Sequence, residues 1–212
     1  MNTDDLIIIL TVMLLSGVGF ILLKKSVEHV SGKMIVYSVI MALIAAVIAI
    51  ILQKVYSGNS LIFNIKRICL LTVLSPVALT DYVEYKIPNR FILAGIIYRV
   101  ILIPIELLFD NEYIIQTIIS EIIAAGALFL AAVLCRLCIK NSIGAGDVKL
   151  FIVMGLFLSL KGIWSAIFMS LIISFFISVY LLISKKKTKK DNIPFGPAIA
   201  AGTYLSVFLT GM

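Results

Sequence analysis

Two aspartates, Asp81 and Asp147, lie at the edges of long apolar runs, in the segments LTDYVEYKIPNRF and NSIGAGDVKLF. Moving a lone carboxylate out of water is costly, so acids at such positions need a reason to be there. Two carboxylates that share one proton supply a reason, because one can act as general base while the other acts as general acid. Such a pair activates water for hydrolysis without a covalent intermediate, so the chemistry needs no metal ion and no cofactor.

Two glycines precede the second aspartate and fit the same chemistry. Gly144 and Gly146 lack a Cβ atom, so their backbone reaches unusual φ/ψ values and lets another chain come close. An extended peptide substrate can pair with such exposed backbone as an added strand. The alternative interpretation is a flexible loop in which Asp147 only caps the apolar run from Val148.

The helix ends predict different roles for the two acids. Asp147 is expected at the N-cap of its run, where the positive end of the helix dipole favours the ionised carboxylate. Asp81 is expected to follow the C-terminal end of its run, where the dipole disfavours a negative charge. Our hypothesis is that Asp147 is more often ionised and Asp81 more often protonated, with the two titrating as a coupled pair.

The elements that position these acids are predicted to be membrane helices. The chain of 212 residues is 62% hydrophobic and only 14% charged, with a mean hydropathy of +1.16, whereas about 25% of a soluble domain is charged. The predicted class is therefore an all-α, polytopic helical membrane protein with one domain over residues 1–212. Asp4 and Asp5 precede the first run where a signal peptide would carry basic residues, so we expect a retained helix there.

About eight apolar segments are visible, which predicts six to eight transmembrane helices. Four are long and uninterrupted enough to span a bilayer: Leu6–Leu23, Met34–Leu52, Gly162–Ser184 and Ile193–Met212. Four others are short or contain charges: Leu61–Thr80, Phe91–Phe109, Tyr113–Ile139 and Val148–Leu160. Charges in such runs face protein or water, so we expect Arg99, Glu106 and Glu121 to pair across helices. Lys66 and Arg67 suggest that Leu61–Ile65 lies along the membrane interface and that the third crossing is short.

The basic residues predict the orientation of the chain in the membrane. With the N-terminus outside and eight crossings, 13 of the 18 Lys and Arg residues fall on cytoplasmic connections. They include the run Lys185–Lys190, which is expected to anchor the chain beside anionic lipid. In this topology Asp81 and Asp147 lie on the same, cytoplasmic side.

Three motifs in this order resemble one family. GAGDVKL (Gly144–Leu150) resembles the G-x-G-D signature of type IV prepilin peptidases, membrane aspartyl proteases that are similar to preflagellin peptidases. DYVEYKIPN (Asp81–Asn89) resembles the segment that carries the other aspartate of that family, with its proline–asparagine turn. IPFGPAIAAG (Ile193–Gly202) resembles its proline–phenylalanine–glycine–proline element. The resemblance covers roughly Leu71–Gly202.

The resemblance implies an aspartic endopeptidase of the bacterial inner membrane with Asp81 and Asp147 as its catalytic dyad. It implies cleavage, on the cytoplasmic side, of the short basic leader that precedes an apolar helix in prepilin or pseudopilin precursors. The implied partners are that precursor and the lipid bilayer, with no metal and no nucleic acid, and no oligomeric state is predicted. The candidate residues for substrate binding or for the shape of the site are Gly144, Gly146, Lys149, Pro88, Asn89, Pro194, Phe195, Gly196 and Pro197.

One departure from the family limits the prediction. Many members carry a cysteine-rich insert near the N-terminus that is linked to zinc and to N-methylation of the cut pilin. Here the connection Lys24–Lys33 contains no cysteine, so we predict a peptidase only. Cys135 and Cys138 form a C-x-x-C inside an apolar run without a second pair, which favours packing over a zinc or redox site.

Other interpretations stay open. The chain is alternatively a preflagellin-type peptidase, a transporter that uses the aspartates as a proton relay, or an assembly subunit without catalysis. Lys149 either attracts the charge of the dyad or extends to lipid headgroups. Glu84 is either a third acid near the site or a solvated loop residue. The Pro194–Pro197 element either shapes a substrate cleft or only begins a helix.

Overall fold

The computed structural model of the protein describes residues 3–27, 32–56, 60–109, 114–138, 144–185 and 192–210. Within these parts the chain forms seven helices and no strand, which confirms the all-α class. Six of the helices, α1 to α6, are long and apolar enough to cross a membrane, so the chain is a polytopic helical membrane protein as predicted. The helices are α1 (Thr3–Ser26), α2 (Gly32–Val55), α3 (Leu61–Glu84), α4 (Asn89–Phe109), α5 (Ile114–Cys138), α6 (Ala145–Ile183) and α7 (Gly196–Thr210).

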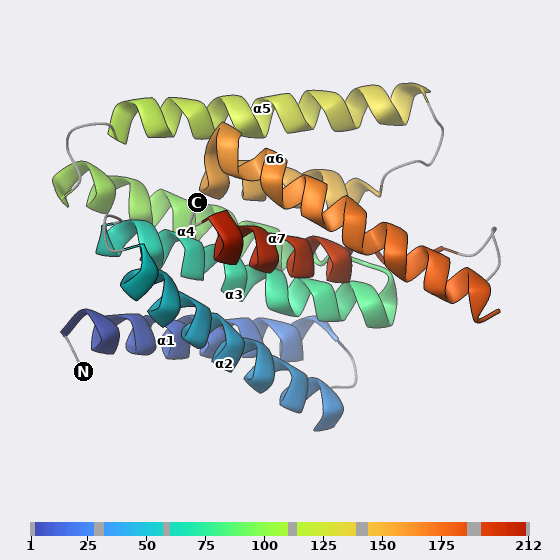
Figure 1. The fold of residues 1–212 in the computed structure, drawn as a ribbon, viewed down its shortest axis with the longest axis horizontal. Helices are drawn as coiled ribbons and strands as arrows, with labels where there is room; N and C mark the ends of the chain where they lie inside the picture. Colours follow the sequence, from blue (N-terminus) through green and yellow to red (C-terminus); the bar gives the residue numbers. More distant parts are fainter. Residues whose placement is uncertain are drawn as a thin grey trace.

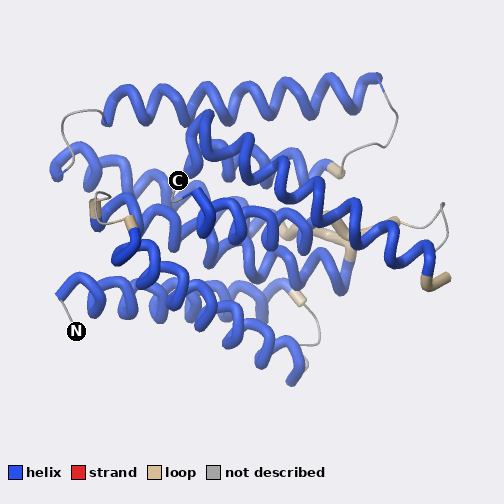
Figure 2. The backbone as a smooth tube through the Cα atoms, viewed as in Figure 1, coloured by secondary structure: helices blue, strands red, loops and turns tan. Residues whose placement is uncertain are grey.

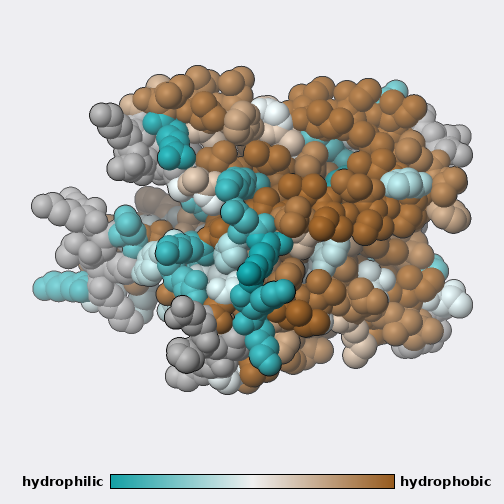
Figure 3. Space-filling model, turned by 180° about the vertical axis from the view of Figure 1, so that it is seen from behind, coloured by the Kyte–Doolittle hydropathy of each residue, from teal (hydrophilic) through white to brown (hydrophobic). Residues whose placement is uncertain are grey.

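The helices lie side by side and the chain reverses direction between them (Figures 1 and 2). The ends of α1, α3, α5 and α6 and the beginnings of α2, α4, α6 and α7 all lie at one end of the bundle, which we call the dyad end because Asp81 and Asp147 lie there. Seen from behind, hydrophilic side chains gather toward this end and hydrophobic side chains cover most of the remainder (Figure 3). Two segments named in the sequence analysis lie partly outside the described residues. They are the connection Lys24–Lys33, at residues 28–31, and the basic run Lys185–Lys190, at residues 186–190.

Helix α6 is two helices joined by a sharp reversal at Ser159. The backbone of Ser159 has φ 56° and ψ −179°, a conformation that residues with a side chain rarely adopt. In a continuous helix Asp147 and Leu171 would be about 36 Å apart, yet both line one cavity. Figure 1 shows the chain turning back at this point. The two halves correspond to the predicted runs Val148–Leu160 and Gly162–Ser184.

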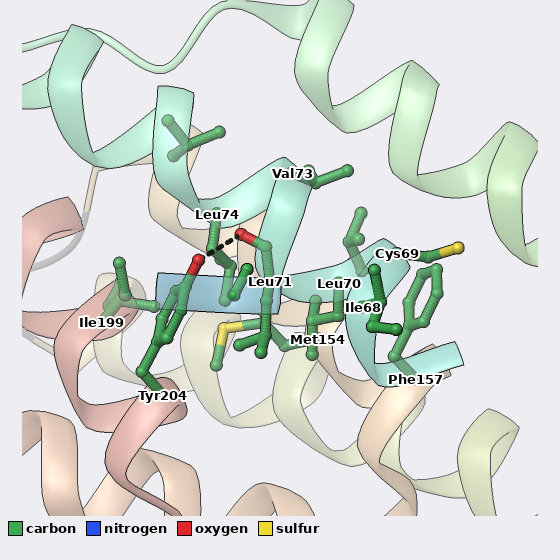
Figure 4. Packing of buried hydrophobic residues seen from close by; sticks show 14 of the residues in the cluster. Ile68, Cys69, Leu70, Leu71, Val73, Leu74, Met154, Phe157, Ile199 and Tyr204 are labelled. Carbon is green, nitrogen blue, oxygen red and sulfur yellow. Dashed lines mark hydrogen bonds between the residues drawn. The ribbon is translucent and has the colours of Figure 1, made fainter. Parts of the chain in front are cut away.

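Helix α3 forms the centre of the bundle and is the most buried of the six long helices. Its side chains Leu70, Leu71 and Leu74 are at most 1% exposed. Tyr204 of α7 donates its hydroxyl hydrogen to the carbonyl oxygen of Leu71 at 3.2 Å (Figure 4) and lies 2.7 Å from the hydroxyl of Ser75. These polar contacts within an apolar core fix the register of α7 on α3, which matters because each helix contributes to the candidate site.

Four buried charges join α3, α4 and α5 in the half of the bundle away from the dyad end. Lys66 lies 2.8 Å from Glu121 and 3.4 Å from Glu106. Arg99 donates to Glu106 through Nη1, at 2.8 Å. It also donates to Glu121, through Nε at 3.0 Å and through Nη2. All four side chains are at most 3% exposed. The predicted pairing across helices is confirmed for Arg99 of α4 and Glu121 of α5, whereas Arg99 and Glu106 pair within α4. The two bases neutralise the two acids.

The prediction of a short third crossing is wrong. Helix α3 is one unbroken helix of 24 residues that already includes Leu61–Ile65. The two bases that suggested a break are buried inside the protein instead, each 2% exposed. Lys66 belongs to the four-charge cluster, and the guanidinium of Arg67 lies 4.0 Å from the centre of the Phe63 ring. Compensation by protein groups therefore lets charged residues stay within a spanning helix.

Candidate active site

Asp81 lies in the last turn of α3 and points at the beginning of α7. Its carboxylate oxygen Oδ2 accepts a hydrogen bond of 2.7 Å from the backbone N–H of Gly196, the first residue of α7, and the backbone N–H of Phe195 also contacts it. The side chain is only 7% exposed. A helix N-terminus presents free N–H groups and the positive end of the dipole, so it is a suitable partner for a carboxylate.

The fit between Asp81 and Gly196 requires a glycine. A Cβ atom on residue 196 would lie 2.8 Å from the Cβ of Asp81 and 2.9 Å from its Oδ2. Real Cβ contacts are not this short, so any side chain at this position would displace one of the two helix ends. This close approach explains the glycine of the P-F-G-P element better than chain flexibility does.

Asp147 lies in the first turn of α6, three residues after the N-cap residue Gly144. The prediction that Asp147 is itself the N-cap is wrong, because Ala145 and Gly146 are already helical. Its carboxylate reaches back to the backbone N–H of Gly144, as the third helical residue does in a capping box. A Cβ on Gly144 would lie 2.8 Å from Asp147 Oδ2, so this position also leaves no room for a side chain.

Both acids therefore lie at a helix N-terminus. The premise that Asp81 follows the end of its helix is wrong, because Asp81 is still within α3 and its carboxylate faces the positive end of α7. The helix dipoles consequently do not separate an ionised Asp147 from a protonated Asp81 in the way that was predicted. The reason is tertiary: the neighbour of Asp81 comes from a helix more than one hundred residues later in the chain.

Asp81 and Asp147 come together at the dyad end. They line the same two cavities, and they are close enough for the charge of Asp81 to act on Asp147. Two like charges that interact in a partly buried site favour a state in which one proton is shared. The structure thus brings together the two acids that the sequence singled out.

The turn between α3 and α4 packs against the beginning of α6. Tyr85 ends α3 in the left-handed conformation, with φ 54° and ψ 33°, and Pro88 precedes the first residue of α4, Asn89. A Cβ on Gly146 would lie 3.0 Å from the Cβ of Ile87. Lys149 donates to Asn89 Oδ1 at 2.9 Å, which gives this lysine a partner that neither prediction for it included. The first two motifs of the sequence thus contact each other directly.

The third motif closes the opposite side of the site. Pro194 and Phe195 line a cavity beside both aspartates, and the Phe195 ring meets the Phe151 ring edge-on, with 6.2 Å between ring centres. Pro197 lies in the first turn of α7. The element therefore both shapes a cavity and begins a helix, so the two interpretations of Pro194–Pro197 describe different residues of the same segment.

Two cavities meet at the dyad. The polar pocket, of about 490 Å³, lies between the α3–α4 turn and the beginning of α6 and is lined by Ser26, Asp81, Glu84, Tyr85, Lys86, Ile87, Pro88, Asn89, Gly144, Ala145, Gly146 and Asp147. The apolar cleft, of about 700 Å³, is lined by Asp81, Tyr85, Leu128, Ala131, Ala132, Cys135, Gly144, Asp147, Phe151, Trp164, Ile167, Leu171, Asn192, Ile193, Pro194 and Phe195. Glu84 thus lies beside the site, as one of its two interpretations proposed.

Several lining residues were not identified from the sequence. Trp164, Ile167 and Leu171 lie in an ordinary apolar run, and only the reversal at Ser159 turns them toward the dyad. Cys135 lines the apolar cleft and is not disulfide-bonded to Cys138. Within the part of the chain that the structure describes, no three His, Cys, Asp or Glu side chains are grouped so that they could hold a metal ion.

Comparison with known proteins agrees with this arrangement. The sequence profile of the type IV leader peptidase family matches residues 68–183, more than half of the chain, including both aspartates and the turn between α3 and α4. The chain belongs to the type IV leader peptidase family. No solved structure matches it.

A relative with a curated name shows the same relationship. The chain is similar to the prepilin leader peptidase/N-methyltransferase of Bacillus subtilis (strain 168), with 32% identity over 136 residues. The aligned part makes up 64% of this chain and 52% of the relative. The chain therefore spans about half the length of the curated relative that it matches.

Proposed function

We propose that this member of the type IV leader peptidase family is a membrane-embedded aspartic endopeptidase in which Asp81 and Asp147 activate water. The observation that carries this function is the meeting of the two acids at the junction of a polar and an apolar cavity. Each acid is held by backbone N–H groups at a helix N-terminus, which fixes the carboxylates without blocking the cavities. A proton relay in a transporter does not require such a junction.

The chemistry follows from a shared proton. The ionised carboxylate takes a proton from water as its oxygen attacks the scissile carbonyl, and the protonated carboxyl donates its proton to the carbonyl oxygen. The tetrahedral intermediate then collapses: one of its hydroxyls returns a proton to the acid that donated one, the C–N bond breaks, and the leaving amine takes a proton from the acid that accepted one. Either acid can start as the base, because both accept backbone N–H groups.

The proposed substrate is a prepilin or pseudopilin precursor, cut on the cytoplasmic side of the bacterial inner membrane. The basic residues of the dyad end support this orientation, including Lys24 and Lys25 at the end of α1 and Arg136 at the end of α5. The name of the relative includes N-methyltransferase, but we propose cleavage alone because the connection Lys24–Lys33 has no cysteine.

Co-expression with a candidate prepilin tests this function. Leader removal is followed by gel shift and mass spectrometry for the wild type, Asp81→Asn and Asp147→Asn. Asp4→Asn is the matched control, because it makes the same change in α1 at the opposite end of the bundle. We expect both dyad variants to insert in the membrane and leave the leader uncut, while the control cleaves normally. Normal cleavage by the double dyad variant would exclude an aspartic mechanism.

A further inference from the structure

The apolar cleft is built by one face of α5 and one face of the second half of α6. Leu128, Ala131, Ala132 and Cys135 recur on α5 at intervals of three and four residues, which places them on one helix face. Trp164, Ile167 and Leu171 do the same on α6. Toward the dyad end the two helices diverge in Figure 1, and the small alanines on α5 leave the space between them open.

The cleft leads from the dyad into the bundle. The stretch from Cys135 to Leu128 covers about 10 Å along the helix axis, roughly two turns. Trp164 is 60% and Leu171 is 54% exposed although both line this cavity. Large apolar side chains that are left open on the α6 wall, together with small alanines on the α5 wall, suit an apolar helical segment better than a water-filled passage.

The polar pocket on the other side of the dyad has the opposite character. Three acids, Asp81, Glu84 and Asp147, line it together with a single base, Lys86. With one proton shared by Asp81 and Asp147, these acids carry two negative charges against the one positive charge of Lys86, and the net negative charge suits a cationic peptide segment. Asp81, Tyr85, Gly144 and Asp147 line both cavities, so the two form one path whose polarity changes at the dyad.

We propose that the cleft between α5 and the second half of α6 holds the apolar segment of the precursor as a helix, while the polar pocket holds the cationic segment on the other side of the scissile bond. The assignment rests on the proposed function, because it places the scissile bond at the dyad. Trp164 and Ala131 are then specificity-determining residues for the apolar segment, and Glu84 for the cationic one.

A second apolar groove offers a competing position for the apolar segment. It has about 580 Å³, lies between α2 and α7, and is lined by residues that include Tyr37, Met41, Pro197 and Ala201. Neither aspartate lines this groove. A segment bound there would have to pass around the beginning of α7 to reach the dyad, so the cleft at α5 fits the geometry better.

Site-specific photo-crosslinking decides between these positions. A photoreactive amino acid is placed at Ala131, at Ala201 or at Leu130 in the Asp147→Asn variant, which is expected to bind but not cut. The probe is the prepilin that the wild-type chain is tested against, carrying an affinity tag after its apolar segment. Leu130 is the matched control, because it directly precedes Ala131 and points about 100° away around α5, with 59% exposure.

We expect an adduct at position 131 and only background at positions 130 and 201. An adduct at 201 without one at 131 would overturn the assignment and place the segment between α2 and α7. Equal adducts at 130 and 131, or none at any position, would overturn it as well. Leader removal by the wild-type chain is measured in the same cells, so that a failure of the proposed function is seen separately from a failure of the cleft assignment.

Discussion

Replacing Gly196 by alanine tests the contact that positions Asp81. The new Cβ would lie 2.8 Å from the Cβ of Asp81, an atom that cannot swing away because it is bound to the backbone of α3. The beginning of α7 must therefore move, and the 2.7 Å hydrogen bond from the Gly196 N–H to the carboxylate is weakened or lost. The substitution changes no charge and removes no side chain, so the perturbation is local.

The expected size of the effect follows from the lost bond. A hydrogen bond to a charged group contributes about 1.5–3 kcal/mol. If the bond holds Asp81 in its reactive position, Gly196→Ala lowers kcat about 10- to 150-fold, since each 1.36 kcal/mol is a factor of ten in rate. Because the Tyr204 bond to Leu71 lies about two turns further along α7, we expect the protein still to fold.

The assay is the kcat for leader removal by purified protein in detergent, measured together with the thermal midpoint. Gly126→Ala on α5 is the matched control, because a Cβ there would have no neighbour within 4 Å. We expect wild-type kcat from the control. Wild-type kcat in Gly196→Ala, or equal losses in the two variants, would refute the role given to this glycine.

Three further changes test other parts of the molecule. Glu121→Leu leaves an uncompensated positive charge in the buried cluster and should lower the free energy of unfolding, measured in detergent, by about 3–5 kcal/mol. Adding Lys66→Met removes that charge and should recover much of the loss. A double variant that loses as much as the two single variants together would contradict the charge argument. Lys149→Met removes the exposed hydrogen bond to Asn89, which contributes about 1 kcal/mol, and should slow cleavage about fivefold. The double variant Lys149→Met/Asn89→Ala should be no slower than Lys149→Met alone. A further loss in the double variant would show that the two side chains do not act through one bond. Glu84→Gln should raise KM about two- to fivefold for a leader with lysines and leave KM unchanged for a neutral leader; an equal rise for both leaders would remove the ionic explanation.

Much of the arrangement follows from local features of the sequence. Runs of about 20 apolar residues require membrane helices, because only a helix satisfies its own backbone within lipid. Counting crossings between Asp81 and Asp147 then places both at the same end of the bundle, and the structure has them there. The sequence also shows the eight apolar segments, because each is a run of apolar residues. In the structure two of these segments are the two halves of α6.

The features that could not be predicted depend on contacts between distant segments. The bond from Gly196 to Asp81 depends on the register of α7 against α3, which no local pattern encodes. Lys66 resembled a helix interruption because its partners, Glu106 and Glu121, come from two other helices. The sequence predicts the start of α6 at Val148, three residues late, because Gly144 and Gly146 indicate a loop, whereas the segment after Gly144 is helical.

The central claim is that Asp81 and Asp147 act together on one water molecule, and the rate of leader removal by purified variants tests it most directly. A general acid or base contributes about 100- to 10,000-fold, and two acids that act as a unit give non-additive losses. We therefore expect Asp81→Asn, Asp147→Asn and the double variant to lose activity to the same extent, each by at least about 100-fold. A single variant that keeps near-wild-type kcat while properly folded would contradict the account.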